Sequence, residues 1–250
     1  MKTRVKTAEE IKAIRKSGEI LAQVLDYLQK SIRAGMTTQD IDDLALAHTI
    51  KLRARPAFHG YQDYPANLCV SVNDEVVHTI PGPRIIKNGD IVGLDYGVIY
   101  DGMITDSAIT VAVGEVSRSA DRLLLGTKRA LDKALDVLRD GVRVGDVGAA
   151  IEAELSAHGL SPAEGLSGHG VGHQVHEDPS IPNFGVKGRG QILKAGMTVA
   201  IEPIAALGNG HIYLADDGWT YKTIDGSLAA QFEHTALITS RGAEILTAIN

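Results

Sequence analysis

The sequence predicts an α+β fold with two similar halves, related by a pseudo-twofold axis and fused across a central antiparallel sheet with flanking helices. Residues 34–44 align with residues 140–150, where a glycine ends one helix and a second helix begins after a short turn. Residues 85–97 align with residues 192–204, and both segments contain the apolar and β-branched runs typical of strands.

Each half is therefore expected to start with two helices and to continue with strands. The segments 8–30 and 119–138 carry apolar residues at helical spacing, and each precedes the start of the second helix of its half. The strand signals follow at 91–94, 108–113, 198–201 and 235–239.

The two halves are expected to form one domain. At roughly 100–200 residues per domain, the 250 residues fit one large domain or two small ones, and no Pro/Ser-rich linker separates the halves. We predict a single domain over residues 1–250 with an internal repeat of about 8–115 and 119–244.

Acidic residues recur at matching positions of the halves. The alignment places Asp95 opposite Glu202, and a looser one places Asp106 opposite Glu233. Any one of them could make its own salt bridge or turn hydrogen bond. If a pseudo-twofold axis relates the halves, however, equivalent strand ends meet at that axis and bring the four carboxylates together. Buried carboxylates that converge need cations, and bridging carboxylates hold two divalent ions roughly 3.5–4 Å apart.

A glycine-rich segment supplies imidazoles. SGHGVGHQVHEDP at 167–179 contains His169, His173 and His176, and its alternating glycines disfavour a helix. In a strand, His169 and His173 would share one face and His176 the other, unless a bulge re-aims them. We expect His169 and His176 to serve a site and His173 to be a solvated side chain. Carboxylates with one or two imidazoles suit Mn²⁺, Co²⁺, Fe²⁺ or Zn²⁺, so the residues predict a two-metal hydrolase.

Composition excludes several other classes of protein. A single cysteine cannot form an intramolecular disulfide, and 25 Lys+Arg against 31 Asp+Glu disfavours a nucleic-acid partner. No run reaches the roughly 18–20 apolar residues of a membrane span, and the first residues lack the apolar core of a signal peptide. We therefore expect a cytoplasmic protein. HExxH, Walker, G-x-G-x-x-G and G-x-S-x-G motifs are absent, and Cys69 lies among apolar neighbours, which favours burial over nucleophilic chemistry.

The chain resembles the methionine aminopeptidases, in particular their short type I form, over nearly its whole length. The resemblance rests on GYQDYPANLCVSVNDEVVH at 60–78, DYGVIYDGMITDSA at 95–108, SGHGVGHQVHEDP at 167–179, AIEP at 200–203 and DGWTYKTIDGSLAAQFEHT at 217–235. It implies the pita-bread fold, which agrees with the internal repeat. The implied activity is removal of the initiator methionine from chains whose second residue is small.

The resemblance also implies the roles of the site residues. Asp95 would be the bidentate ligand of one divalent ion, Asp106 and Glu233 would bridge two ions, and His169 and Glu202 would complete the second coordination sphere. The implied cofactors are two ions among Co, Mn, Fe, Zn and Ni. Glu202 would also carry the proton, and the substrate would contact the catalytic His78 and His176 and a methionine pocket formed by Tyr61, Tyr64, Cys69, His78 and Trp219.

Three positions depart from the family pattern. Thr79 and Asp63 stand where glycine is common, and Val175 replaces a bulky aromatic residue. Because valine is smaller, we expect a roomier methionine pocket. None of the five ligand positions is changed.

Two alternative functions remain. Prolidases and Xaa-Pro aminopeptidases have similar ligands but generally carry a large additional N-terminal domain, and a pita-bread binding protein without activity would have lost ligands. Type II methionine aminopeptidases usually insert a helical block between the positions of His176 and Glu202, where this chain has only 25 residues. The expected partners are the N-termini of peptides and nascent chains, and the protein is expected to come transiently close to the ribosome. Neither a nucleic-acid substrate nor a membrane is expected. The protein is expected to be a monomer.

Overall fold

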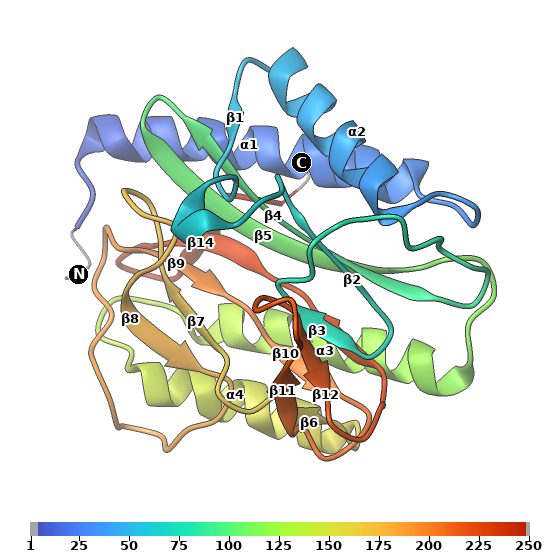
Figure 1. The fold of residues 1–250 in the computed structure, drawn as a ribbon. Coiled ribbons are helices and arrows are strands. Elements are labelled where there is room, and N and C mark those ends of the chain that lie inside the picture. The colour runs from blue at the N-terminus through green and yellow to red at the C-terminus, as the bar shows by residue number, and fades with distance from the viewer. Residues whose placement is uncertain (1–4, 249–250) are drawn as a thin grey trace.

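Four α-helices flank the strands in a computed structural model that describes residues 5–248. Figure 1 shows α1 and α2 on one side of the strands and α3 and α4 on the opposite side. The helices are α1 (Ala8–Ser31), α2 (Thr38–Lys51), α3 (Arg118–Val137) and α4 (Val144–Ala157). The predicted helix pair is thus present in each half.

The second helix of each half begins in the same way. The carboxylate of Asp40 accepts a hydrogen bond from the Thr37 backbone N–H, and that of Asp146 accepts one from the Arg143 N–H. Such a carboxylate in the first turn satisfies a backbone donor at the start of the helix. The N-cap residue of each of these helices also forms an isolated β-bridge within its own half. Thr37 pairs with Ile85, and Arg143 pairs with Ile192. These paired contacts follow the alignment of residues 34–44 with 140–150.

All strand pairs are antiparallel, and they form four groups rather than the single sheet expected from the sequence. One group contains β1, β4, β2 and β5, another runs β15-β14-β9-β7-β8, and two three-stranded groups are β13-β10-β6 and β11-β12-β3. The strands are β1 (Arg55–Pro56), β2 (Cys69–Val72), β3 (Glu75–Val77), β4 (Ile91–Tyr100), β5 (Met103–Ala112), β6 (Ser161–Pro162), β7 (Ser167–Gly170), β8 (Glu177–Pro182), β9 (Thr198–Ile201), β10 (Ile204–Ala206), β11 (Ile212–Leu214), β12 (Tyr221–Thr223), β13 (Ala229–Gln231), β14 (His234–Ile238) and β15 (Ala243–Ile245), with a 3-10 turn η1 (Tyr61–Asp63).

A seam of hydrogen bonds joins the two larger groups. The Glu233 N–H donates to the Ala108 carbonyl at 2.9 Å, and the Thr235 hydroxyl donates to the Asp106 carbonyl at 2.7 Å. The Asp106 N–H in turn donates to the Thr235 hydroxyl. Acidic residues of both halves therefore flank one line of contact between β5 and β14.

The hydrophobic core follows the two halves. One cluster packs α1 and α2 against β2, β4 and β5, with Leu21, Leu68 and Tyr96 almost completely buried. The other packs α3 and α4 against β9 and β14, with Leu123 and Ile151 at its centre. Within residues 5–248, no helix is long and apolar enough to cross a membrane.

The expectation that all four acidic residues lie at strand ends is wrong for the first half. Asp95 and Asp106 lie in the interior of β4 and β5, whose ladder is continuous from Ile91 to Tyr100. Glu202 and Glu233 do lie at strand ends, directly after β9 and directly before β14. The difference has a local cause, because Pro203 follows Glu202 and lacks the N–H that would continue the ladder.

Candidate active site

One cavity of about 270 Å³ collects every residue that the sequence predicted for the site. Its lining comes from both halves of the chain and from strands and loops that are far apart in the sequence. The predicted residues in its wall are Tyr61, Tyr64, Cys69, His78, Asp95, Asp106, His169, His176, Glu202, Trp219 and Glu233. The fold therefore brings together what the sequence only placed in separate motifs.

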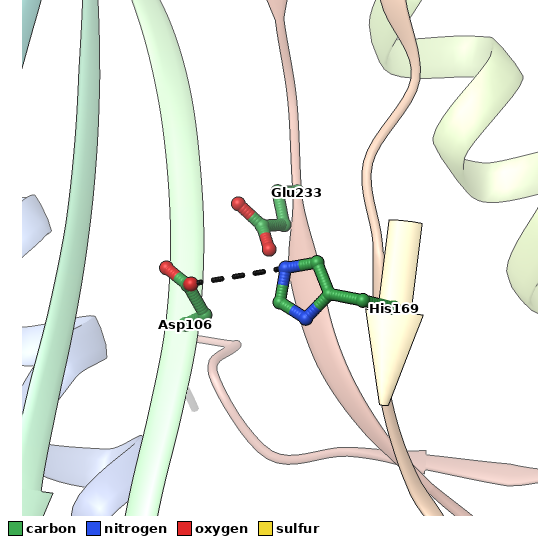
Figure 2. Close-up of side chains that lie close together, drawn as sticks. All are labelled: Asp106, His169 and Glu233. Atoms are coloured by element: carbon green, nitrogen blue, oxygen red, sulfur yellow. Dashed lines mark ion pairs between the residues drawn. The ribbon is translucent and has the colours of Figure 1, made fainter. Parts of the chain in front are cut away.

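Three of the candidate ligands face one another in the cavity. Figure 2 shows the side chains of Asp106, His169 and Glu233 directed toward a common centre, and one ligand atom from each lies within 4.8 Å of the others. His169 Nε2 lies 4.0 Å from Asp106 Oδ2 and 3.5 Å from Glu202 Oε1. Asp95 lines the same cavity on the neighbouring strand, since β4 and β5 pair side by side.

The buried carboxylates have unsatisfied oxygens. Asp95 Oδ1, Asp106 Oδ1 and Glu233 Oε1 are buried without any hydrogen-bond partner. Burial raises the pKa of Asp95 to about 7, and burial together with the neighbouring carboxylates raises the pKa values of Asp106 and Glu233 well above their usual range. Bare burial of such groups is costly, and a divalent cation removes the cost by binding the ionised oxygens. The buried carboxylates are therefore suited to bind divalent metal ions.

The imidazole of His169 is oriented for metal binding. Its Nδ1 lies 3.0 Å from the carbonyl oxygen of Gly170, which can only accept a hydrogen bond, so Nδ1 carries the proton. The lone pair of Nε2 then points to the carboxylates. Burial lowers the pKa of His169 to about 3, which keeps the ring neutral and able to act as a ligand.

Two further histidines line the cavity beside the acidic cluster. The ring of His176 lies 4.4 Å from the His169 ring, and its Nδ1 lies 3.0 Å from the Tyr61 hydroxyl. His78 has a left-handed backbone with a φ of 60°, an uncommon conformation that often marks a functional position. Burial lowers the pKa of His78 to about 4 and lowers that of His176 as well, so both rings are neutral near pH 7. Neutral rings can donate hydrogen bonds to a substrate.

The three histidines do not share one strand, but the predicted alternative of a bulge has a counterpart, because the register of β7 with β8 shifts between Gly168 and Gly170. β7 ends at Gly170, and the chain then turns before β8 starts at Glu177, so His173 and His176 lie in the turn. His169 and His176 therefore reach the same cavity. His173 points elsewhere: it is 30% exposed and its Nε2 lies 2.7 Å from Glu10 Oε1, so it is held by a carboxylate rather than merely solvated.

Aromatic and apolar side chains form the wall next to the acidic cluster. The rings of Tyr64 and Trp219 meet edge to face at 5.0 Å, and Cys69 and Val175 lie in the same buried cluster. Burial raises the pKa of the Cys69 thiol well above its ordinary value, which leaves the thiol protonated and unreactive, as the sequence predicted. The result is a small apolar pocket open to the acidic cluster.

The structure explains two of the three positions that depart from the family pattern. Asp63 has a φ of 68°, a conformation that favours glycine and that aspartate tolerates better than most residues. Thr79 is 8% exposed, and its hydroxyl accepts a hydrogen bond from Ser71 while its carbonyl accepts one from the Tyr64 hydroxyl. The threonine is therefore part of the buried network that holds Tyr64, a residue of the pocket wall.

Gln231 is a site residue that the sequence did not predict. Its side-chain amide lies 3.4 Å from Glu202 Oε2 and 3.4 Å from Glu233 Oε2, and its backbone is held by the Thr110 hydroxyl. The signal was its position two residues before Glu233, since alternate residues of an extended chain share a face.

Comparisons with known proteins agree with this geometry. The profile of metallopeptidase family M24 matches residues 12–240. The methionine aminopeptidase of Clostridium perfringens is 41% identical over 245 residues, 98% of each chain. That of Aquifex aeolicus is 45% identical over 248 residues, 95% of this chain and 96% of the relative.

Solved structures give the same result. The methionine aminopeptidase of Thermotoga maritima matches with a TM-score of 0.97 at 44% identity and covers 99% of this chain and 100% of its own. The prolidase of Pyrococcus furiosus matches with a TM-score of 0.81 at 23% identity, a likeness of fold alone that covers 98% of this chain and 66% of the prolidase. The predicted pita-bread fold and the predicted hydrolase are confirmed, and divalent metal ions are the cofactors of this family. The chain belongs to metallopeptidase family M24, and within that family it groups with the methionine aminopeptidases.

Proposed function

We propose that the protein removes an N-terminal methionine from peptides and nascent chains whose second residue is small. One observation carries the proposal: unsatisfied, buried carboxylate oxygens lie in the same cavity as a small pocket of aromatic, apolar and thiol groups. Aromatic rings and a thiol suit the polarisable thioether of methionine. The curated relatives that match over nearly the full chain are named methionine aminopeptidases.

Five side chains are proposed to hold two divalent ions. Asp106 and Glu233 lie on the two sides of the seam between the halves, with ligand atoms within 4.8 Å of each other, and would be shared by both ions. When bound, the two ions would lower the pKa of a water molecule and polarise the scissile carbonyl. Carboxylates with one imidazole accept Co, Mn, Fe, Zn or Ni, and the full proposed ligand set is Asp95, Asp106, His169, Glu202 and Glu233.

Glu202 is the proposed proton carrier. Its side chain is 12% exposed at the edge of the acidic cluster, 3.5 Å from His169 and within reach of the Gln231 amide. A carboxylate in this position accepts a proton from the attacking water and passes it to the leaving amine. Burial and the Asp95 carboxylate raise the pKa of Glu202, which makes it a better proton acceptor.

The two remaining histidines are proposed to bind the substrate. His78 and His176 line the cavity with neutral rings. Their N–H groups would donate hydrogen bonds to the substrate backbone and to the carbonyl oxygen as it gains negative charge. Tyr61 fixes the His176 ring through the 3.0 Å contact at Nδ1, which leaves Nε2 for this task.

The methionine side chain is proposed to occupy the pocket of Tyr61, Tyr64, Cys69, His78 and Trp219. Val175 belongs to the same buried cluster and lines the cavity. A valine at this position leaves more room than an aromatic residue would, so modest cleavage after residues other than methionine is expected.

Turnover of short peptides tests the function directly. The protein, loaded in turn with Co²⁺, Mn²⁺, Fe²⁺, Zn²⁺ or Ni²⁺, should release methionine from Met-Ala-Ser and cleave Leu-Ala-Ser and an Ala-Pro peptide far more slowly. Preference for the Ala-Pro peptide would make it a proline-directed peptidase of the same fold. Inactivity on all peptides with every metal would favour a binding protein without catalytic activity.

The cellular setting is part of the proposal. A single thiol and a net charge of -6 are typical of a cytoplasmic enzyme without a nucleic-acid substrate. We propose a monomer that meets nascent chains near the ribosome. Light scattering and co-sedimentation with ribosomes measure these two properties separately.

A further inference from the structure

A buried ion pair links the N-terminal segment to the turn that carries His176. Lys6 Nζ lies 2.8 Å from Glu177 Oε2, and the two side chains are 0% and 3% exposed. Burial alone would raise the pKa of Glu177, but the Lys6 ammonium and two backbone N–H donors outweigh it, and the pKa lies below its ordinary value. Glu177 is therefore ionised and fully used as a hydrogen-bond acceptor.

The second oxygen of Glu177 holds the turn itself. Glu177 Oε1 accepts hydrogen bonds from the backbone N–H groups of His173 at 2.6 Å and Gln174 at 3.2 Å. One carboxylate thus connects the ammonium of Lys6 to the middle of the turn that links β7 to β8.

The backbone is shaped to admit the Lys6 side chain. Gly172 has a φ of 144°, and a Cβ at this position would lie 2.5 Å from Lys6 Cε. The Lys6 N–H donates to the Gly196 carbonyl at 2.8 Å, which fixes the strap formed by residues 5–7. A second, partly exposed contact joins α1 to the turn. One oxygen of Glu10 accepts a hydrogen bond from the Thr7 N–H at the start of α1, and the other lies 2.7 Å from His173 Nε2.

His176 depends on this turn more than His169 does. His169 lies in β7 and pairs with Ala200 in the ladder between β7 and β9. His176 lies outside any ladder, directly before Glu177 in the chain. Its position is therefore set by the turn, by the pairing of the next residue, Glu177, with Gly170, and by the contact of its ring with Tyr61.

We propose that Lys6 is a positioning residue, which acts through Glu177 to hold the turn of residues 171–176 so that His176 faces the substrate. The inference rests on the proposed function for the role of His176. Lys6 is not among the residues that line the cavity, and its ammonium pairs with Glu177, which is not a proposed metal ligand. A misplaced His176 would slow the chemical step without weakening metal binding.

The Lys6→Met variant tests the proposal, because methionine fills the stem and removes only the charge. With Met-Ala-Ser as substrate, kcat should fall roughly 10- to 100-fold, the size expected for a displacement of about 1 Å. KM and the Mn²⁺ affinity measured by calorimetry should stay near wild-type values. Hydrogen exchange by mass spectrometry should be faster at the amides of His173 and Gln174. Lys16→Met, which removes an exposed ion pair with Glu19, is the matched control and should change none of these.

A double variant separates positioning from general stability. In Lys6→Met/Glu177→Gln no unpaired charge is buried, and the glutamine carbonyl still accepts the two turn N–H bonds, so most of kcat and of the exchange protection should return. If Lys6→Met does not fold, Glu177→Asp keeps the charge but shortens its reach, and it should show the same loss of kcat with faster exchange.

Three outcomes would overturn the proposal. They are unchanged exchange in the turn, faster exchange with normal kcat, and a loss of Mn²⁺ affinity as large as the loss of kcat. Exchange is measured without substrate, so it decides whether Lys6 holds the turn even if the wild-type protein does not cleave Met-Ala-Ser. The latter result would count against the proposed function alone.

Discussion

The two halves of the molecule present their acidic residues on different scaffolds. In the first half, Asp95 and Asp106 lie on adjacent strands of one long hairpin, β4–β5. In the second half, Glu202 and Glu233 flank a longer excursion that contains β10, β11, β12 and β13. The excursion carries Trp219 and Gln231, which line the cavity and have no counterpart in the first hairpin.

This difference separates two properties of the site. Four of the five proposed metal ligands are acidic residues that match between the halves, and the fifth, His169, comes from the second half alone. Metal binding thus draws mainly on what the halves share, whereas the proposed methionine pocket is built from residues that do not match between them. Four predictions test this division, from the largest expected effect to the smallest.

The equivalent residues Asp106 and Glu233 should be equally indispensable. Asp106→Ala and Glu233→Ala should each reduce cleavage of Met-Ala-Ser below detection, because each removes a shared ligand from both proposed ions. Calorimetric titration with Mn²⁺ should show the loss of at least one binding event. Asp216→Ala, an exposed acid in the excursion, is the control and should behave as wild type. Retained activity in either ligand variant would refute the shared roles.

Asp95 and Glu202 occupy matching positions but should differ in effect. Glu202→Gln should lower kcat by roughly 10²- to 10⁴-fold, because it removes the proton carrier. Asp95→Asn should weaken Mn²⁺ binding, and its activity should partly return at high metal concentration. The same pattern in both variants would mean that the halves are functionally symmetric here.

The β11–β12 hairpin, which carries Trp219 in its connection, should govern selectivity rather than chemistry. Trp219→Ala should lower kcat/KM for Met-Ala-Ser by roughly 10- to 100-fold, mainly through KM, because it removes one wall of the apolar pocket. Tyr213→Ala, on the same hairpin but 47% exposed and outside the cavity, should have no such effect. An effect of Trp219→Ala confined to kcat would place this residue in the chemistry instead.

The smallest effect concerns the stability of the metal-free protein above about pH 6.5. Burial raises the pKa of Asp95 to about 7 and keeps those of Asp106 and Glu233 well above their usual range. The unfolded chain has already lost these protons, so the folded chain binds more of them, and the free energy of unfolding should fall as pH rises. Denaturation in urea with EDTA should show this slope, and Mn²⁺ should abolish it. A flat profile without metal would contradict the assignment.

Below about pH 6.5 the buried histidines act in the opposite sense. Burial lowers the pKa of His78 to about 4 and that of His169 to about 3. The unfolded chain then binds protons at these histidines that the folded chain does not, so their contribution to stability falls as the pH decreases, against the contribution of the carboxylates. The carboxylates are therefore tested above this range, where the histidines are neutral in both states.

Much of the fold could be predicted because local chemistry repeats along the chain. The apolar spacing and the glycines at 35 and 141 locate the helix pairs, and the alignment of 85–97 with 192–204 locates β4 and β9. The four acidic ligands follow from acidic residues that recur in or beside apolar strands, whereas the choice of His169 among the histidines of the glycine-rich segment rests on the resemblance to the methionine aminopeptidases. These features are local in sequence, so one chain is enough to recognise them.

The sequence by itself determined the fold class, the recurring acids and the metal-binding chemistry. Only the tertiary structure decided that Asp95 and Asp106 lie within strands, that Gln231 bridges Glu202 and Glu233, and that Lys6 holds the His176 turn. The physical reason is distance along the chain. Residues 6 and 177 meet only because α1 and the turn between β7 and β8 are packed together, and no periodicity or motif encodes a contact of that separation.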